Sequence, residues 1–330
     1  MMHKRWIVLA AFVVVGLAGA GLVAGPASAQ SYPSRPIRML VGFSAGGPAD
    51  VMARLIGQRM AVTLGRPIVV ENRAGAGGTI AARVVAEAEP DGYTLLLGNT
   101  STLVISPLMY KNVGYDALKA FAPIARLGTT SDILVTNPGF PARTLAELIA
   151  SAKANPGKLN YSTPGIGTPP HLIGEMLKLR AGVDIVHVPY KSGGQSIQAV
   201  VAGEVQFTFE NPAVALPLVQ AGVVRALAVT SAARHPQAAD VPTLVEGGLP
   251  GFVSVSFTGV VGPAGIPRDI VTKLNSAINE SLKSPDVAAT LGKLAVDVKN
   301  ETPGEFAAFL TEEMAATMPV IKAAGLLGVE

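Results

Sequence analysis

One local pattern occurs once in each half of this 330-residue sequence: a short apolar strand, a glycine-rich turn and the start of a helix. In the first half, the strand 37–41 leads into the turn 42–47, and Pro48 suits the first position of a helix. In the second half, the strand 159–163 leads into the turn 164–170 and then a helix. Strands and helices alternate around both copies, which is typical of sheets covered by helices on both faces. The pattern predicts an α/β protein with two mainly parallel sheets.

The remaining elements follow from hydrophobic periodicity, turn residues and helix caps. Thr144 with Glu147, and Thr302 with Glu305, have the spacing of capping boxes that open helices. Gly65 suits the end of the first helix. We expect further strands at 68–70, 93–97, 133–135, 185–188, 205–209 and 225–229, and further helices at 79–88, 145–155, 171–179, 195–202, 213–220 and 267–282, with a last helix after Thr302.

The composition excludes several classes of protein. The chain has no cysteine, so it has no disulfide framework, thiolate metal site, iron–sulfur cluster or cysteine nucleophile. Its formal charge of +3 comes from 26 basic and 23 acidic residues, two of the basic ones being Lys4 and Arg5 near the N-terminus. This near balance of charge does not support nucleic-acid binding.

The first 29 residues have the parts of a secretory signal peptide. A basic pair is followed by an apolar stretch at 6–24, and residues 27–29 have the small-residue pattern of a cleavage site. The alternative is a retained membrane anchor, because the apolar stretch is nearly long enough to span a bilayer. Pro26 and the small residues favour cleavage after Ala29, which predicts a secreted chain that begins at Gln30.

The two glycine-rich turns are candidates for anion binding. A helix N-terminus presents unpaired N–H groups and about half a positive charge, and it therefore attracts carboxylate or phosphate. If the two halves face each other, the turns would hold either an anion with carboxylates at both ends or one with a carboxylate and a polar group.

Two nucleotide-binding motifs fail on residue identity. The turn 42–47 has the spacing of a phosphate-binding loop, but Pro48 and Ala49 stand where lysine and a hydroxyl residue are required. The segment 75–80 lacks the third glycine of the dinucleotide pattern, because Ile80 occupies its position.

The enzymatic alternative is a serine esterase. Residues 42–46 match the G-x-S-x-G elbow, with Ser44 as nucleophile and His171 or His187 as base. The elbow requires strands and an oxyanion loop upstream, and only about a dozen residues of the secreted chain precede Ser44. His171 and Glu175 are one helical turn apart, but without a third ligand they make a poor metal site.

The order of motifs resembles one known family. The segments that carry the resemblance are 32–37, 46–50, 70–78, 90–95, 156–161, 167–172, 187–191, 225–230 and 240–243. They make the secreted chain similar, over its whole length, to the periplasmic solute-binding receptors of tripartite tricarboxylate transporters, often called the Bug family. The resemblance implies a two-lobed periplasmic binding protein fold (type II-like) with an interlobe ligand cleft, lobe 1 at 30–130 and 251–330 and lobe 2 at 131–250. It implies a monomer that binds a small organic carboxylate, closes about a hinge and delivers the ligand to a two-component membrane permease, without cofactor, metal or catalysis.

The resemblance also implies the binding residues. They form two anion turns and the end of one strand: Phe43, Ser44, Ala45, Gly46, Gly47 and Asp50; Thr163, Gly165, Gly167, Thr168 and His171; and Glu210. Two departures from the family leave the ligand open between a plain dicarboxylate and a compound with a donor group. The first turn lacks the usual prolines and gains a serine, and Glu210 replaces the usual aspartate. A ligand-sensing receptor for a signalling partner is the alternative to transport, because the same site serves both.

Overall fold

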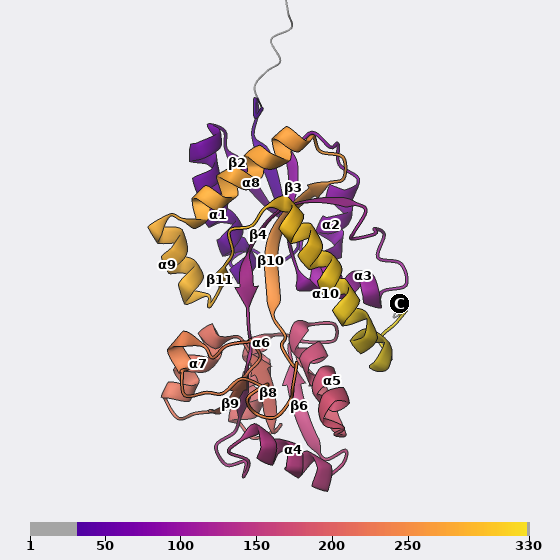
Figure 1. Cartoon of the computed structure of the whole chain (residues 1–330), viewed down its shortest axis with the longest axis vertical. Coiled ribbons are helices and arrows are strands. Elements are labelled where there is room, and N and C mark those ends of the chain that lie inside the picture. The colour runs from indigo at the N-terminus through magenta and orange to yellow at the C-terminus, as the bar shows by residue number, and fades with distance from the viewer. Residues whose placement is uncertain (1–31, 329–330) are drawn as a thin grey trace, which may run out of the picture.

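The computed structural model describes residues 32–328. The expected signal peptide and its cleavage site after Ala29 lie outside these residues. The described chain forms two units, one above the other along the longest axis of the molecule, and each is built on its own sheet (Figure 1). Among the described helices, none is both long enough and apolar enough to cross a membrane.

The first unit contains a six-stranded sheet with the order β11-β4-β10-β3-β1-β2. Strands β1 to β4 point in one direction, and β10 and β11 point in the other. The strands are β1 (Ile37–Val41), β2 (Ile68–Asn72), β3 (Thr94–Asn99), β4 (Phe121–Thr130), β10 (Ser256–Pro263) and β11 (Asp297–Val298).

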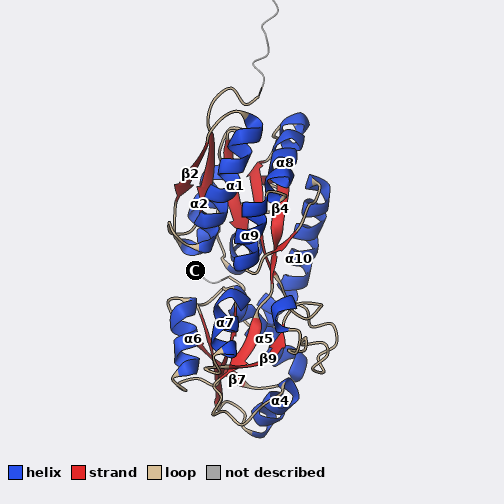
Figure 2. Ribbon diagram, turned by 90° about the vertical axis from the view of Figure 1, so that its left-hand side faces the viewer, coloured by secondary structure: helices blue, strands red, loops and turns tan. Residues whose placement is uncertain are grey.

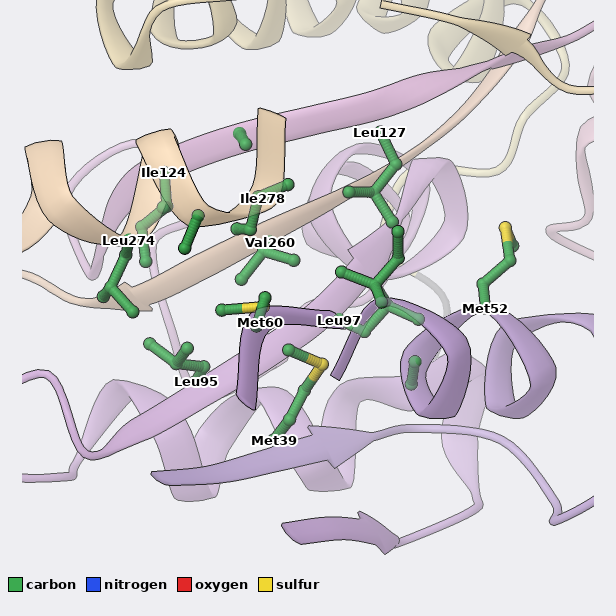
Figure 3. Packing of buried hydrophobic residues seen from close by; sticks show 14 of the residues in the cluster. Met39, Met52, Met60, Leu95, Leu97, Ile124, Leu127, Val260, Leu274 and Ile278 are labelled. Atoms are coloured by element: carbon green, nitrogen blue, oxygen red, sulfur yellow. The ribbon is translucent and has the colours of Figure 1, made fainter. Parts of the chain in front are cut away.

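Helices cover both faces of this sheet. One face packs against α1 (Pro48–Leu64), α8 (Arg268–Leu282) and α9 (Pro285–Lys293), and Figure 3 shows part of this core. The other face packs against α2 (Thr79–Ala86) and α10 (Pro303–Ala323). Next to them lie η1 (Ala76–Gly78), η2 (Ser101–Ile105) and α3 (Ser106–Met109). Neighbouring residues of β1 point to opposite faces, with Met39 in the first core and Leu40 in the second.

The second unit contains a five-stranded sheet with the order β7-β6-β8-β5-β9, in which only β5 is reversed. Its helices also lie on both faces (Figure 2). The strands are β5 (Ile133–Thr136), β6 (Leu159–Thr163), β7 (Ile185–Pro189), β8 (Phe207–Glu210) and β9 (Arg225–Val229). The helices are α4 (Leu145–Ala154) and α5 (Pro169–Ala181) on one face and α6 (Gly193–Val201) and α7 (Pro212–Gln220) on the other, with η3 at Pro236–Ala238.

The two sheets share one connectivity. Apart from the added edge strand β11, each sheet has its first forward strand, β1 or β6, in the middle of three parallel strands, followed by a reversed strand and then a further forward strand. In both cases the reversed strand, β5 or β10, is the first one formed after the chain arrives from the other unit. The expected α/β class with two mainly parallel sheets is confirmed.

The chain crosses between the units twice. The first crossing runs from Thr130 to Ile133, and the return crossing lies at 253–255, because Phe252 still packs in the core of the second unit. The crossing segments lie on either side of Thr230. The Thr230 amide donates to Asp132 O at 2.9 Å, and the Ser254 amide donates to Thr230 O at 2.9 Å.

The predicted caps are found, with one difference. Thr302 and Glu305 form the complete capping box of α10, and Gly65 ends α1 with φ +69°. At α4, the Thr144 hydroxyl accepts from the Glu147 amide as expected. The Glu147 carboxylate, however, accepts from the Arg143 amide instead of the Thr144 amide, so this box is displaced by one residue.

Candidate ligand-binding site

The first turn joins β1 to α1, and Asp50, in the first helical turn of α1, stabilises it by a side-chain hydrogen bond. The Asp50 side chain is only 4% exposed, and its Oδ2 accepts from the Gly46 amide at 2.9 Å and from Arg54 Nε at 3.0 Å. The bond from Arg54, and then that from Gly46, lowers the pKa of Asp50 to about 2. Asp50 therefore holds the shape of the turn, and its carboxylate is already paired with this arginine.

The outer part of the first turn is open. Ser44, Ala45 and Gly46 are exposed. Within residues 32–328, no hydrogen bond engages the Ser44 hydroxyl or the Ala45 amide. The Phe43 carbonyl accepts from Asn72 Nδ2 at 3.0 Å, which anchors the start of the turn. The exposed donors are free to bind an anion.

Replacing Asp50 by asparagine is expected to destabilise the protein by about 1–2 kcal/mol at pH 7, because it removes the interactions that lower the pKa of Asp50. The loss is smaller than the full pKa shift implies, since solvent partly screens the ion pair with the half-exposed Arg54. A carboxyl whose folded pKa is lowered contributes stability above its ordinary pKa of 3.8, and this stability is lost as the pH falls through about 2. The difference between the two proteins should therefore shrink below about pH 4.

Urea unfolding at several pH values measures this difference. The matched control is Asp286→Asn, which breaks an exposed aspartate–arginine pair with Arg59 and should change stability little. An Asp50→Asn protein as stable as the wild type at pH 7 would show that the Asp50 carboxylate is not needed.

The second turn joins β6 to α5 and is bonded internally. The Thr168 hydroxyl donates to Gly165 O at 2.7 Å, and the Gly165 amide donates to Thr163 Oγ1 at 3.1 Å. The Gly167 amide donates to His171 Nδ1 at 3.2 Å. Because Pro169 and Pro170 have no N–H group, α5 offers fewer amide donors at its N-terminus than an ordinary helix. A ligand at this turn would replace bonds that the turn now makes within itself.

Two histidines support the second turn from α5 and β7. The His171 and His187 rings stack with centroids 4.0 Å apart, and His187 Nε2 lies 2.6 Å from Thr163 Oγ1. Burial lowers the pKa of both, that of His187 to about 4. The Gly167 bond requires an unprotonated Nδ1 on His171, so the turn is built around neutral imidazoles.

Glu175 is not directed toward a metal with His171. Its carboxylate accepts from the Tyr161 hydroxyl at 2.9 Å and pairs with Lys178 at 3.0 Å. These contacts use Glu175 inside the second unit.

Glu210 ends β8 beside Asp132, a residue that the sequence analysis did not identify. Both side chains are more than nine-tenths buried, and Glu210 Oε1 accepts from the Asn211 amide at 2.9 Å. Burial, with the neighbouring Glu210 carboxylate, raises the pKa of Asp132 to about 7, and burial also raises the pKa of Glu210. These two carboxyl groups disfavour a further negative charge beside them.

Both turns approach one short helical segment, η2 and α3, at 101–109, the first through Gly77 and Gly78 and the second directly. Its Thr102 hydroxyl donates to Gly77 O at 3.0 Å, beside Gly78, on which the Phe43 ring packs. At its other end, Met109 lies against Gly167, since a methyl group added there would be 3.0 Å from the Met109 sulfur. The turns therefore come from different units and lie near the same segment. We call this region, formed by the two turns and residues 101–109, the seam. No hydrogen bond joins the two turns in the described residues.

Ser44 has no base in this arrangement. The two candidate histidines belong to the second unit, where one is bonded to Gly167 and the other to Thr163. No hydrogen bond within residues 32–328 connects Ser44 to either ring. The geometry required of a serine nucleophile is therefore not formed.

This fold, with two sheets of equal connectivity, two crossings and one strand–turn–helix from each unit at the seam, is that of the two-lobed periplasmic binding proteins. Residues 52–326 match the model of the tripartite tricarboxylate transporter family receptor. The chain belongs to this family, whose members are periplasmic solute-binding receptors and not enzymes.

The individual relatives agree with this assignment. Protein BugT of Bordetella pertussis is 36% identical over 318 residues, which cover 96% of this chain and 97% of BugT. A solved structure of an R. palustris protein with adipate is 33% identical, with a TM-score of 0.79 over 90% of this chain and 100% of that one. MatC from Rhodopseudomonas palustris with bound malate is 35% identical, with a TM-score of 0.75 over 88% of this chain and 100% of that one.

Proposed function

We propose that this chain is a periplasmic receptor that captures a small organic carboxylate between its two units and delivers it to a two-component membrane permease. The observation that supports the proposal is that one turn of each unit approaches the segment 101–109, the first through Gly78 and the second through Gly167. Closure would remove the ligand from water. In the closed site, each hydrogen bond to a charged group of the ligand contributes about 1.5–3 kcal/mol.

The free donors of the first turn suit one carboxylate, bound by the Ser44 hydroxyl and neighbouring amides. The buried pair Asp132 and Glu210 suits an uncharged or donor-bearing part of the ligand. A dicarboxylate with one carboxylate at the first turn, the other at the second turn and its uncharged part beside Asp132 and Glu210 satisfies both requirements. Adipate and malate in the related structures are of this class.

We further propose that the units act as the two lobes of a monomer, lobe 1 at 30–130 and 251–330 and lobe 2 at 131–250. The two crossings at 131–132 and 253–255 would form the hinge, since they are the chain connections between the sheets. Small-angle scattering with and without ligand tests closure, and light scattering of the secreted chain tests the monomer.

The first test of function is calorimetric titration of the secreted chain, refolded to remove retained ligand, with a panel of carboxylates. The panel contains adipate and malate, the matching monocarboxylates, and an amino acid. Saturating binding of a dicarboxylate at one site per chain supports the proposal. No binding by any member of the panel, with a folded protein, contradicts it.

Replacing Thr168 by alanine is expected to weaken dicarboxylate binding by about fivefold to tenfold, the equivalent of one hydrogen bond. The hydroxyl fixes Gly165 O, so its loss loosens the second turn as well as removing a donor. The control is Thr311→Ala, at an exposed position of α10, where the hydroxyl donates to Ala307 O within the same helix. Unchanged affinity in the Thr168→Ala protein, measured by calorimetry, would show that the second turn does not bind the ligand.

A further inference from the structure

A pocket of about 360 Å³ lies on the first unit, where α2 meets the loop that follows α3. Thr79 and Arg83 of α2 form one wall, and Tyr110, Lys111 and Asn112 of the loop form the other. The pocket includes no residue of the two turns, and its volume is within the range of small-molecule sites.

The walls of the pocket are held by tertiary contacts. The Arg83 stem lies on Gly114, where an added methyl group would be 2.5 Å from Arg83 Cδ. Gly114 has φ +84°, a conformation that glycine adopts without strain. At the end of the loop, the Tyr115 hydroxyl donates to Thr102 O at 2.6 Å. The aliphatic part of the Arg83 side chain is therefore held by packing, and its guanidinium group extends from it.

The pocket carries positive charge and a free hydroxyl. Within residues 32–328, neither Arg83 nor Lys111 forms an ion pair with an acidic side chain. Thr79 is 4% exposed, yet its hydroxyl has no hydrogen-bond partner among the described residues, and the residue borders the pocket. Thr79 also begins α2, so the positive end of that helix lies at the same place. Two cations and an accessible hydroxyl without a partner at the wall of the pocket point to an anionic ligand.

We propose that this pocket is a second anion site, which binds a small organic carboxylate separately from the seam. Arg83 and Lys111 pair with the carboxylate, Thr79 donates to it, and Ala76 and Val113 cover its apolar part. The pocket adjoins the seam through Met109, which precedes Tyr110 and packs on Gly167. Carboxylate bound here is held on the first unit beside the place where the two turns meet.

The test is titration of the ¹⁵N-labelled secreted chain with succinate, followed by the amide resonances of 76–79 and 110–113. The Arg83→Gln/Lys111→Gln protein should bind succinate at these amides at least about tenfold more weakly, since it loses two charge-assisted contacts. The matched control is Arg268→Gln/Lys283→Gln, an equal loss of charge at two exposed positions of the α8 region. Raising the salt concentration should weaken binding in the wild type.

Amides that do not shift with succinate, or an affinity unchanged in the Arg83→Gln/Lys111→Gln protein, would overturn the proposal. Inorganic phosphate serves as the second probe, and binding of phosphate without succinate would overturn the carboxylate assignment. The seam is read independently at the amides of 43–47 and 163–168, so a failure of the receptor proposal appears in a different set of resonances.

Discussion

Replacing Gly42 by alanine is expected to lower the free energy of unfolding by about 3 kcal/mol and to abolish ligand binding at the seam. A methyl group at Gly42 would lie 2.4 Å from Gly78 Cα and 3.0 Å from Gly78 O. Both neighbours are backbone atoms, so no side-chain rotation relieves the clash. Either β1 or η1 has to move, and this displaces the first turn from the segment 101–109.

The same turn provides a matched control. Gly47→Ala adds the same methyl group five residues later, where the nearest atom is Ser44 O at 3.4 Å and φ is −78°. This change should leave stability close to that of the wild type and should not abolish ligand binding. Thermal unfolding and calorimetric titration of both variants check the prediction. It is contradicted if Gly42→Ala melts with the wild type or if the two variants are equally damaged.

Gly42 also illustrates what the sequence revealed. Both turns and their helices were predictable, because apolar strands, glycine, proline and capping residues are local signals. The contact of Gly42 with Gly78 was not, because it joins two loops that are far apart in the sequence.

Strands β4 and β10 were missed for a related reason. β10 contains Gly259 and Gly262, which weaken the pattern of a strand. Gly259 is needed because a methyl group there would lie 2.4 Å from the Phe306 ring of α10. β4 contains Arg126, whose guanidinium pairs with Glu301 and lies 3.7 Å from the Phe309 ring centroid. In both strands, the residue that breaks the local pattern has a distant partner.

In the candidate site too, the sequence identified residues but not the distant contacts that set their roles. Asp50 was identified as a binding residue, but its partner Arg54 fixes it beneath the turn. Asp132 had no motif, and only the pairing of β5 with β8 brings it beside Glu210. The residues that give the site its charge are therefore set by strand register, for which a single sequence carries little signal.

The stability of the second turn is expected to fall by about 2 kcal/mol as the pH is lowered from 6.5 to 4, because His187 must remain neutral in the folded protein. Its folded pKa of about 4 is below its ordinary value of 6.5, so between these values the unfolded chain binds more protons. The contribution is complete above pH 6.5, declines as the pH falls toward 4, and then stays constant.

The groups around His187 determine how this loss reaches the ligand. Tyr161 and Thr163 face it from β6, and His171 and Lys178 face it from α5, while Glu175 acts on the neighbouring His171. Protonation of His187 places a cation 4.0 Å, centroid to centroid, from the His171 ring, and protonation of His171 removes the acceptor of the Gly167 amide. Acid should therefore release the second turn before the rest of the second unit unfolds.

Urea unfolding and ligand titration of His187→Asn between pH 4 and 7.5 measure this effect. The variant should lose most of the slope of stability with pH between 6.5 and 4. His235→Asn lies outside the turn and removes a histidine whose pKa burial lowers less, so it should keep most of the slope. The bond between Gly167 and His171 requires neutral imidazole, so ligand affinity should fall over the same range in the wild type and less in His187→Asn. If the two variants show equal slopes, the histidine stack does not control the turn. The carboxyl pair Asp132 and Glu210 cannot replace it as the cause, because their raised pKa values make the folded protein more stable as the pH falls.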